Sequence, residues 1–338
     1  MRELTDRERS SSRTGFSSVS KVATVLGALL WCVIAVGSIV RRLWLGPIEV
    51  LFLLAPLVHV PLGFRVVRRL FGEYSPFGRI AIIVLPLGAI SAATSFWLPV
   101  GRIAAVLAAG WFLVCGLAAF DGLWRLFRGG YRSAEGLCIS ASFAYLAVGG
   151  VWLVLSRSGT LPMHFAEPIV LLTAVHFHFM GFALPIMAGA TGRALGKREP
   201  IGYSAVERST FRFVATGIIG GPAIVAAGFV LSSALLKLVG ALLLAMASIG
   251  LAGFVLFVLP WIRPRLAKVL LSISAASLVV GMILAATYAV GEFTERYWLL
   301  IPQMARLHGT ANALGFTLCG LLGWTLAAQT EKRLRKGL

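Results

Sequence analysis

The chain has 338 residues, of which 58% are hydrophobic and 13% are charged, whereas ordinary soluble domains are about 25% charged. With a mean hydropathy of +0.88, this composition excludes a water-soluble globular protein and predicts an all-α, polytopic integral membrane helix bundle. The formal net charge of +18 does not indicate nucleic acid as a partner, because the basic residues lie in short connections between apolar runs. There they set membrane topology and contact the lipid bilayer.

The first 21 residues mix both charge signs with serines and hold no hydrophobic core, so we expect a disordered cytosolic tail at 1–21 rather than a signal peptide. Ten apolar segments follow, each long enough to cross a bilayer. They lie at about 22–40, 47–64, 80–98, 103–120, 134–155, 166–190, 211–232, 238–260, 269–290 and 298–326. The chain is thus divided into this tail, a ten-span membrane domain at 22–328 and a basic cytosolic tail at 329–338.

The distribution of lysine and arginine supports this count of spans. With a cytoplasmic N-terminus, the cytoplasmic segments carry 24 basic residues, the exterior segments carry six, and Arg306 lies inside a span. A missed span would move every later loop to the other face and destroy the asymmetry. The sequence therefore predicts a multi-pass protein of the cell membrane with both termini in the cytoplasm.

Carboxylates open two of the spans near the predicted outer interface. Glu49 follows Pro47 at the start of the second span, and Glu167 opens the sixth. A buried carboxyl group can keep its proton and pass it to a substrate, which makes both residues candidate general acids. The alternative is structural, since a carboxylate in the first turn of a helix is stabilised by the helix dipole. His59, alone on the second span, is expected to be structural and to face lipid.

Histidines lie in the middle of two other apolar spans. The sixth span carries His176 and His178, and the tenth carries His308 followed by Asn312. At 1.5 Å per residue, all three imidazoles lie about 15–18 Å deep, near the middle of the bilayer. Ionisable groups at that depth usually mark function. Because isolated polar groups lack partners in hydrocarbon, we expect His176 or His178 to share one site with His308 and Asn312.

The spacing of the two histidines of the sixth span limits what they can bind. Residues two apart on a regular helix point about 200° away from each other. His176 and His178 therefore bind one metal ion only if Gly181 and Pro185 unwind the segment. One of them with His308 and a carboxylate could form a metal site, and two histidines could ligate haem. An acid/base or hydrogen-bonding role needs neither, so no cofactor is predicted, and a metal or haem stays open.

Segments of three spans resemble the YndJ-like family of bacterial integral membrane proteins. They are Thr173–Pro185 (TAVHFHFMGFALP), His308–Phe316 (HGTANALGF) and Ile48–Leu57 (IEVLFLLAPL). Because these motifs lie far apart, the resemblance covers most of the membrane domain. It implies that the family's polar set comprises Glu49, Glu167, His176, His178, His308 and Asn312, and it identifies no substrate.

Two functions fit these residues. In a membrane-embedded acid/base enzyme, Glu49 or Glu167 would protonate a lipophilic small-molecule substrate such as an isoprenoid or terpenoid and start its cyclisation or isomerisation, while a histidine takes the final proton. In a multi-pass transporter, the midplane histidines and Asn312 would form a substrate or proton site between two halves of five spans. Short loops leave little surface for a polar substrate, so the enzyme is our first hypothesis. The transporter is the alternative, and a sensor or structural role comes third. The sequence does not indicate an oligomeric state.

Overall fold

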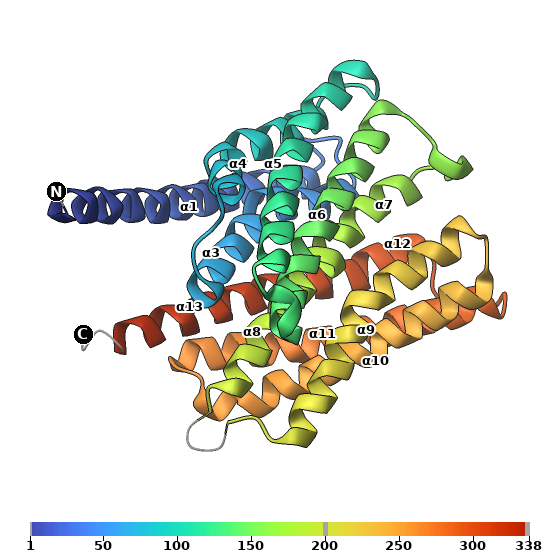
Figure 1. The fold of residues 1–338 in the computed structure, drawn as a ribbon. Coiled ribbons are helices and arrows are strands. Elements are labelled where there is room, and N and C mark those ends of the chain that lie inside the picture. The colour runs from blue at the N-terminus through green and yellow to red at the C-terminus, as the bar shows by residue number, and fades with distance from the viewer. Residues whose placement is uncertain (1, 199–201, 335–338) are drawn as a thin grey trace.

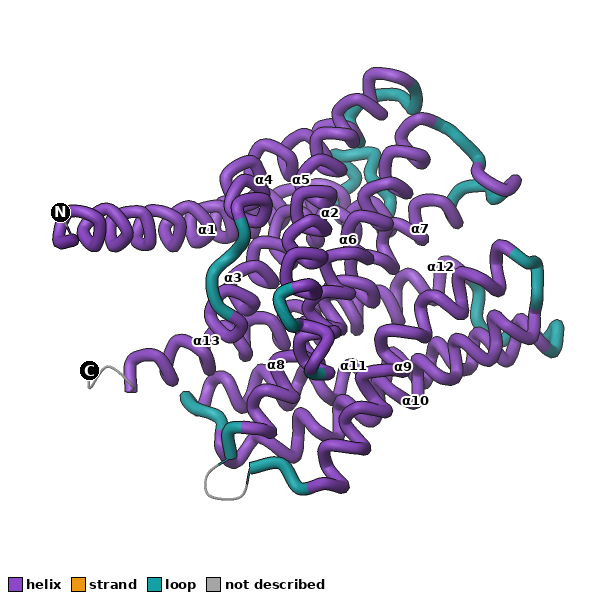
Figure 2. The backbone as a smooth tube through the Cα atoms, viewed as in Figure 1, coloured by secondary structure: helices purple, strands orange, loops and turns teal. Residues whose placement is uncertain are grey.

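The computed structural model describes residues 2–198 and 202–334, and every regular element in them is helical, which confirms the all-α fold (Figures 1 and 2). Short 3-10 or π segments are labelled η. The elements are α1 (Arg2–Ile39), α2 (Pro47–Leu54), η1 (Ala55–His59), α3 (Val60–Phe71), α4 (Pro76–Ser95), α5 (Arg102–Phe127), η2 (Gly130–Arg132), α6 (Ala134–Ser158), η3 (Pro162–His164), α7 (Ile169–His176), η4 (Phe177–Ala183), α8 (Leu184–Gly196), α9 (Ala205–Val230), α10 (Ala234–Val258), η5 (Leu259–Trp261), α11 (Arg265–Phe293), α12 (Ile301–Met304), η6 (Ala305–Gly309), η7 (Ala311–Leu318) and α13 (Cys319–Leu334).

Ten helical stretches within the described residues are long and apolar enough to cross a membrane, which confirms the predicted number of spans. They are Lys21–Ile39, Pro47–Phe71, Pro76–Ser95, Arg102–Phe127, Ala134–Ser158, Ile169–Gly196, Ala205–Val230, Ala234–Trp261, Arg265–Phe293 and Ile301–Arg333. Several run further than hydropathy predicts. The second continues through three arginines to Phe71, since long basic side chains reach the interface from the end of a span. The cytoplasmic position of both termini stays a prediction.

Helix α1 runs from Arg2, through the segment for which the sequence predicts a disordered tail. Its first half projects away from the bundle in Figure 1, whereas its second half is the first span. A helix that has formed in an apolar span extends outward at little cost, and residues 2–21 contain no proline to stop it. The disordered cytosolic tail at 1–21 stays a prediction.

Three spans form the centre of the bundle, and we call them the central spans. They are the second (α2, η1 and α3), the sixth (α7, η4 and α8) and the tenth (α12, η6, η7 and α13). Buried residues make up 83%, 72% and 56% of their most apolar windows, against 17–50% for the other seven spans. Contacts of α2 with α7, α3 with α8 and α13, and η4 with η7 join the central spans to one another.

Helix α1 contacts the second span and α4, and the other six helices pack around this centre in two groups. Helices α4, α5 and α6 form one group, and α9, α10 and α11 form the other, with α13 lying beside both α3 and α11 (Figure 1). Helix α6 of the fifth span packs along the whole sixth span, α7, η4 and α8. The packing therefore does not separate the chain into two halves of five spans.

Each central span departs from α-helical geometry in its middle. The π segments of the described residues are η1, η4, η6 and η7, and all four belong to the central spans. Prolines accompany two of them, because Pro56 lies in η1 and Pro185 follows η4, and a proline removes an N–H from the helical ladder. Such π turns occur frequently at functional sites. His59, His178, His308 and Asn312 lie within these segments, and His176 directly precedes one.

Candidate functional site

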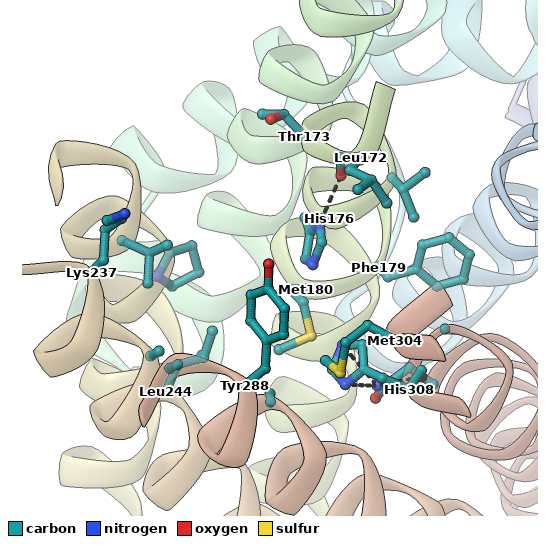
Figure 3. A pocket seen from close by; sticks show the side chains of 18 of the residues that line it. Leu172, Thr173, His176, Phe179, Met180, Lys237, Leu244, Tyr288, Met304 and His308 are labelled. Carbon is teal, nitrogen blue, oxygen red and sulfur yellow. Dashed lines mark hydrogen bonds between the residues drawn. The ribbon is translucent and has the colours of Figure 1, made fainter. Parts of the chain in front are cut away.

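A cavity of about 390 Å³ lies between the central spans and the group α9, α10 and α11 (Figure 3). Its volume falls within the range of about 300–1,000 Å³ that small-molecule sites occupy. Most of its lining is aliphatic or aromatic. The polar side chains that line it are Thr173, His176, Lys237, Tyr288, Glu292, His308 and Asn312. This combination of apolar walls and few polar groups is typical of a ligand site.

His176 ends α7 and points its imidazole into the cavity (Figure 3). Its Nδ1 lies 2.7 Å from the carbonyl oxygen of Leu172, one turn earlier on the same helix. Because a carbonyl oxygen only accepts hydrogen bonds, this contact places the proton on Nδ1. The Nε2 lone pair is then left to accept a proton or a hydrogen bond from whatever enters the cavity.

His308 reaches the same cavity from the tenth span. Its Nδ1 donates to the carbonyl oxygen of Gly281 on α11 over 2.8 Å, which again leaves Nε2 as the acceptor. The ring centroids of His176 and His308 are 6.4 Å apart, with planes 27° from parallel. The structure thus brings together two imidazoles that were expected at one depth.

Asn312 completes this group from the next turn of the tenth span. Its Nδ2 donates to the carbonyl oxygen of His308 over 2.9 Å and lies 3.3 Å from His308 Nε2. Its Oδ1 is buried and has no hydrogen-bond partner among the described residues. Gly281 makes room for it, because a Cβ there would lie 2.6 Å from Asn312 Nδ2. Gly281 is thus part of the site through both its carbonyl and its missing side chain.

His178 lies outside the cavity, although it is only two residues from His176. It is fully buried, its Nδ1 donates to the carbonyl oxygen of Ala174 over 2.8 Å, and its Nε2 accepts from the indole N–H of Trp111 over 2.8 Å. The π segment η4 does not unwind the chain enough to turn both histidines to one place. With both ring nitrogens satisfied, His178 holds α5 against the sixth span.

The two carboxylates that were expected to act as acids do not line the cavity. Glu49 is half-buried in the first turn of α2, where a Cβ on Gly46 would lie 2.6 Å from its Oε2. Glu167 is exposed, and its oxygens accept from Ser156 Oγ over 2.6 Å and from the N–H of Leu171 over 3.2 Å. Glu167 therefore satisfies an N–H at the start of α7, as the structural alternative expects.

His59 is buried rather than lipid-facing, which corrects the expectation from the sequence. Its side chain has no exposed surface, because the second span lies at the centre of the bundle and has the largest buried share of the ten. Its ring meets Phe179 edge to face, with centroids 5.0 Å apart. Neither ring nitrogen has a hydrogen-bond partner among the described residues.

Three cavity residues were missed by the sequence reasoning. Lys237, near the start of α10, pairs through Nζ with Oε1 of Glu292, near the end of α11, and lies over the ring of Phe229 at 5.1 Å. Tyr288 lies one turn before Glu292, and Figure 3 shows its hydroxyl inside the cavity. The sequence did contain one indication of them: Tyr288 and Glu292 are four positions apart, which puts both on one face of a helix.

The described residues do not supply the donor set of a metal centre. No group of three or more His, Cys, Asp or Glu residues within 2–198 and 202–334 is placed to hold a metal ion. His176 and His308 would be two ligands, and the neighbouring Asn312 offers an amide. We therefore derive the chemistry of the site from the imidazoles themselves.

Comparison with known proteins adds one family and one relative. The model of the YndJ-like protein family matches residues 50–316, which include His176, His308 and Asn312. The Bacillus subtilis (strain 168) protein named "Uncharacterized membrane protein YndJ" is 29% identical over 241 residues, covering 71% of this chain and 41% of that protein. The chain thus spans about two fifths of the length of this curated relative. No solved structure matches the chain.

Proposed function

This chain belongs to the YndJ-like family, and we propose that it is a membrane-embedded acid/base enzyme that acts on a lipophilic substrate in the cavity between its central spans. The observation that carries the proposal is the pair His176 and His308. Both have Nδ1 bound to a backbone carbonyl. Nε2 of His176 then faces the apolar cavity, and Nε2 of His308 lies 3.3 Å from Nδ2 of Asn312, a contact that a substrate would replace. A positioned neutral imidazole is the commonest general base in enzymes.

The chemistry that suits these groups is a proton-shift isomerisation. One imidazole Nε2 takes a proton from a carbon next to a polarised group of the substrate and returns it to another carbon, so that atoms and electrons balance without a co-reactant. The hydroxyl of Tyr288, which enters the cavity, would donate a hydrogen bond to the oxygen on which charge develops. Such a donor in a dry site stabilises the transition state more than in water.

A reaction that begins with protonation by Glu49 or Glu167 finds less support. Neither carboxylate lines the cavity, and Glu167 already accepts hydrogen bonds from Ser156 and Leu171. The carboxylate that does line it, Glu292, is already paired with Lys237. Of cyclisation and isomerisation, the geometry favours isomerisation.

Transport is the second candidate function, and the location of the cavity between two sets of helices favours it. The cavity is lined by central spans on one side and by α9, α10 and α11 on the other, so relative movement of these groups would change its access. Many transporters bind their substrate near the midplane, between elements that move against each other. In that case the two histidines would bind a substrate or a proton without chemical conversion.

Deuterium incorporation tests the enzyme directly. Detergent-solubilised protein is incubated in D₂O with a lipophilic extract of the cells that produce it, and the extract is searched by mass spectrometry for compounds that gain deuterium from the solvent. Wild-type protein should label at least one compound, and His308→Gln should lower the rate by about 10²–10⁴-fold. Thr310→Val, an exposed position on the same span outside the cavity, is the matched control and should keep the wild-type rate. Absence of labelling, together with gradient-dependent uptake by wild-type protein in sealed vesicles, would select the transporter.

A further inference from the structure

Two groups of polar residues line the cavity at different depths. The inner group is His176, His308 and Asn312, anchored on the carbonyl of Gly281 in α11. The outer group is the ion pair of Lys237 and Glu292. Gly281 and Glu292 are eleven residues apart on one α-helix, which separates the two groups by about 16 Å along the helix axis.

A mostly apolar wall connects the two polar groups. On α11 the cavity is lined at positions 282, 285, 288, 289, 292 and 293, which lie on one face of a helix. Before Glu292, that face presents the apolar side chains of Met282, Ala285 and Ala289 and the ring of Tyr288 with its hydroxyl. The length of about 16 Å is close to half of the roughly 30 Å hydrocarbon core of a bilayer, so the wall matches the acyl chain of one lipid leaflet.

The ion pair determines which headgroup fits the outer end. The side chains of Lys237 and Glu292 are 23% and 31% exposed, so a ligand can reach both. A purely anionic headgroup would bind Lys237 but meet the negative charge of Glu292. A zwitterionic headgroup can instead place its anion on Lys237 and its cation on Glu292, which replaces one charge-assisted contact by two.

From these observations we infer that the cavity takes a zwitterionic, single-chain amphiphile, with its headgroup at Lys237 and Glu292 and its chain directed toward His176 and His308. A cavity of about 390 Å³ is at the small end of ligand sites and accommodates one chain rather than two. The inference rests on the proposed function in one respect: the reactive carbon of the substrate lies along the chain, about 16 Å from the headgroup.

Binding of lysophospholipids in a non-ionic detergent tests the inference without any turnover. The probes are lysophosphatidylethanolamine, lysophosphatidylglycerol and a monoacylglycerol, all with a 14-carbon chain, and the dissociation constants are measured by native mass spectrometry. The zwitterionic lysophosphatidylethanolamine should bind most tightly. The double variant Lys237→Gln/Glu292→Gln should weaken its binding at least about tenfold, since charge-assisted hydrogen bonds are lost, and should leave the monoacylglycerol unchanged.

A charge-swapped protein shows whether the variants fold. Lys237→Glu/Glu292→Lys keeps an ion pair at the same place, and it should bind lysophosphatidylethanolamine within a few fold of wild type because the headgroup can turn around. Equal binding of the zwitterionic and neutral probes, stronger binding of the anionic probe, or no loss in the double glutamine variant would each overturn the inference.

The failure of this inference is distinguishable from failure of the proposed function. His308→Gln should lower the rate of deuterium labelling by about 10²–10⁴-fold but leave the binding of lysophosphatidylethanolamine within a few fold of wild type. Binding of lysophosphatidylethanolamine without any labelling would contradict the proposed enzyme activity and support the inferred class of ligand. Labelling of some other compound, with no lysophospholipid bound, would contradict the inferred class of ligand and support the proposed enzyme activity.

Discussion

His176 and His178 lie two residues apart on one span, and their surroundings differ. His176 has one nitrogen bound to its own helix and the other in the cavity, whereas His178 has both nitrogens bound, one of them to Trp111 on α5. Residue type, depth and neighbouring sequence are nearly the same for both. The difference teaches that residue type and depth do not select the candidate histidines of a membrane span, which are those whose ring faces a cavity that a ligand can enter.

The largest expected effect comes from replacing the histidines that line the cavity. Replacing His308 by Gln keeps a hydrogen-bonding side chain but removes the base, so turnover should fall by about 10²–10⁴-fold. His176→Gln should act in the same direction. Turnover is measured as the initial rate of deuterium incorporation per folded molecule. A near-normal rate in both variants would mean that the cavity histidines only bind.

Removing the phenol of Tyr288 should have the next largest effect. Tyr288→Phe deletes the hydroxyl that faces the cavity and should lower turnover by about 10²-fold, the usual loss for one donor to a developing oxyanion. Thr287→Val is the matched control, because Thr287 is the adjacent residue of the same helix, is half-buried and does not line the cavity. If both variants react at the wild-type rate, the hydroxyl takes no part in the chemistry.

Changes around the buried His178 should alter the stability of the protein rather than its rate of turnover. Trp111→Phe leaves the buried Nε2 of His178 without a donor, which should lower the free energy of unfolding by about 1–3 kcal/mol. The measurement is unfolding of the solubilised protein with increasing sodium dodecyl sulfate. Trp124→Phe, exposed on the same helix, should unfold as wild type does. A loss of turnover per folded molecule in Trp111→Phe would give His178 a role beyond packing.

The smallest effect is expected at the outer end of the sixth span. Glu167→Gln keeps an acceptor for Ser156 and Leu171 and removes only a charge at a helix start, worth about 0.3–1 kcal/mol. Turnover should stay within a few fold of wild type. A fall of about 10²-fold or more would restore Glu167 as the general acid.

Much of the fold follows from the sequence, because a bilayer imposes length and polarity on each span. Hydropathy gives the ten spans, and the depth of His176 and His308 within them puts both at one level. The bilayer sets no such rule for which spans lie beside one another in the membrane plane. Nothing in the sequence indicates that Trp111, 67 residues earlier, binds His178, or that the ends of α10 and α11 join Lys237 to Glu292. The lipid-facing role expected for His59 failed for the same reason, since hydropathy does not separate a span buried among helices from one that faces lipid.

The π turns of the central spans are the places where these spans can change their length by one residue. A π turn is an inserted residue that the helix has absorbed, so deleting one residue from Phe177–Ala183 would return that turn to α-helical geometry. The following helix Leu184–Gly196 would keep the direction of its faces, and its buried side chains, which include Ile186, would stay in the core. Deleting one residue from the regular helix Ile169–His176 would instead turn everything after it by about 100°. We therefore expect the central spans to accept a change of one residue at their π turns and not in their α-helical parts.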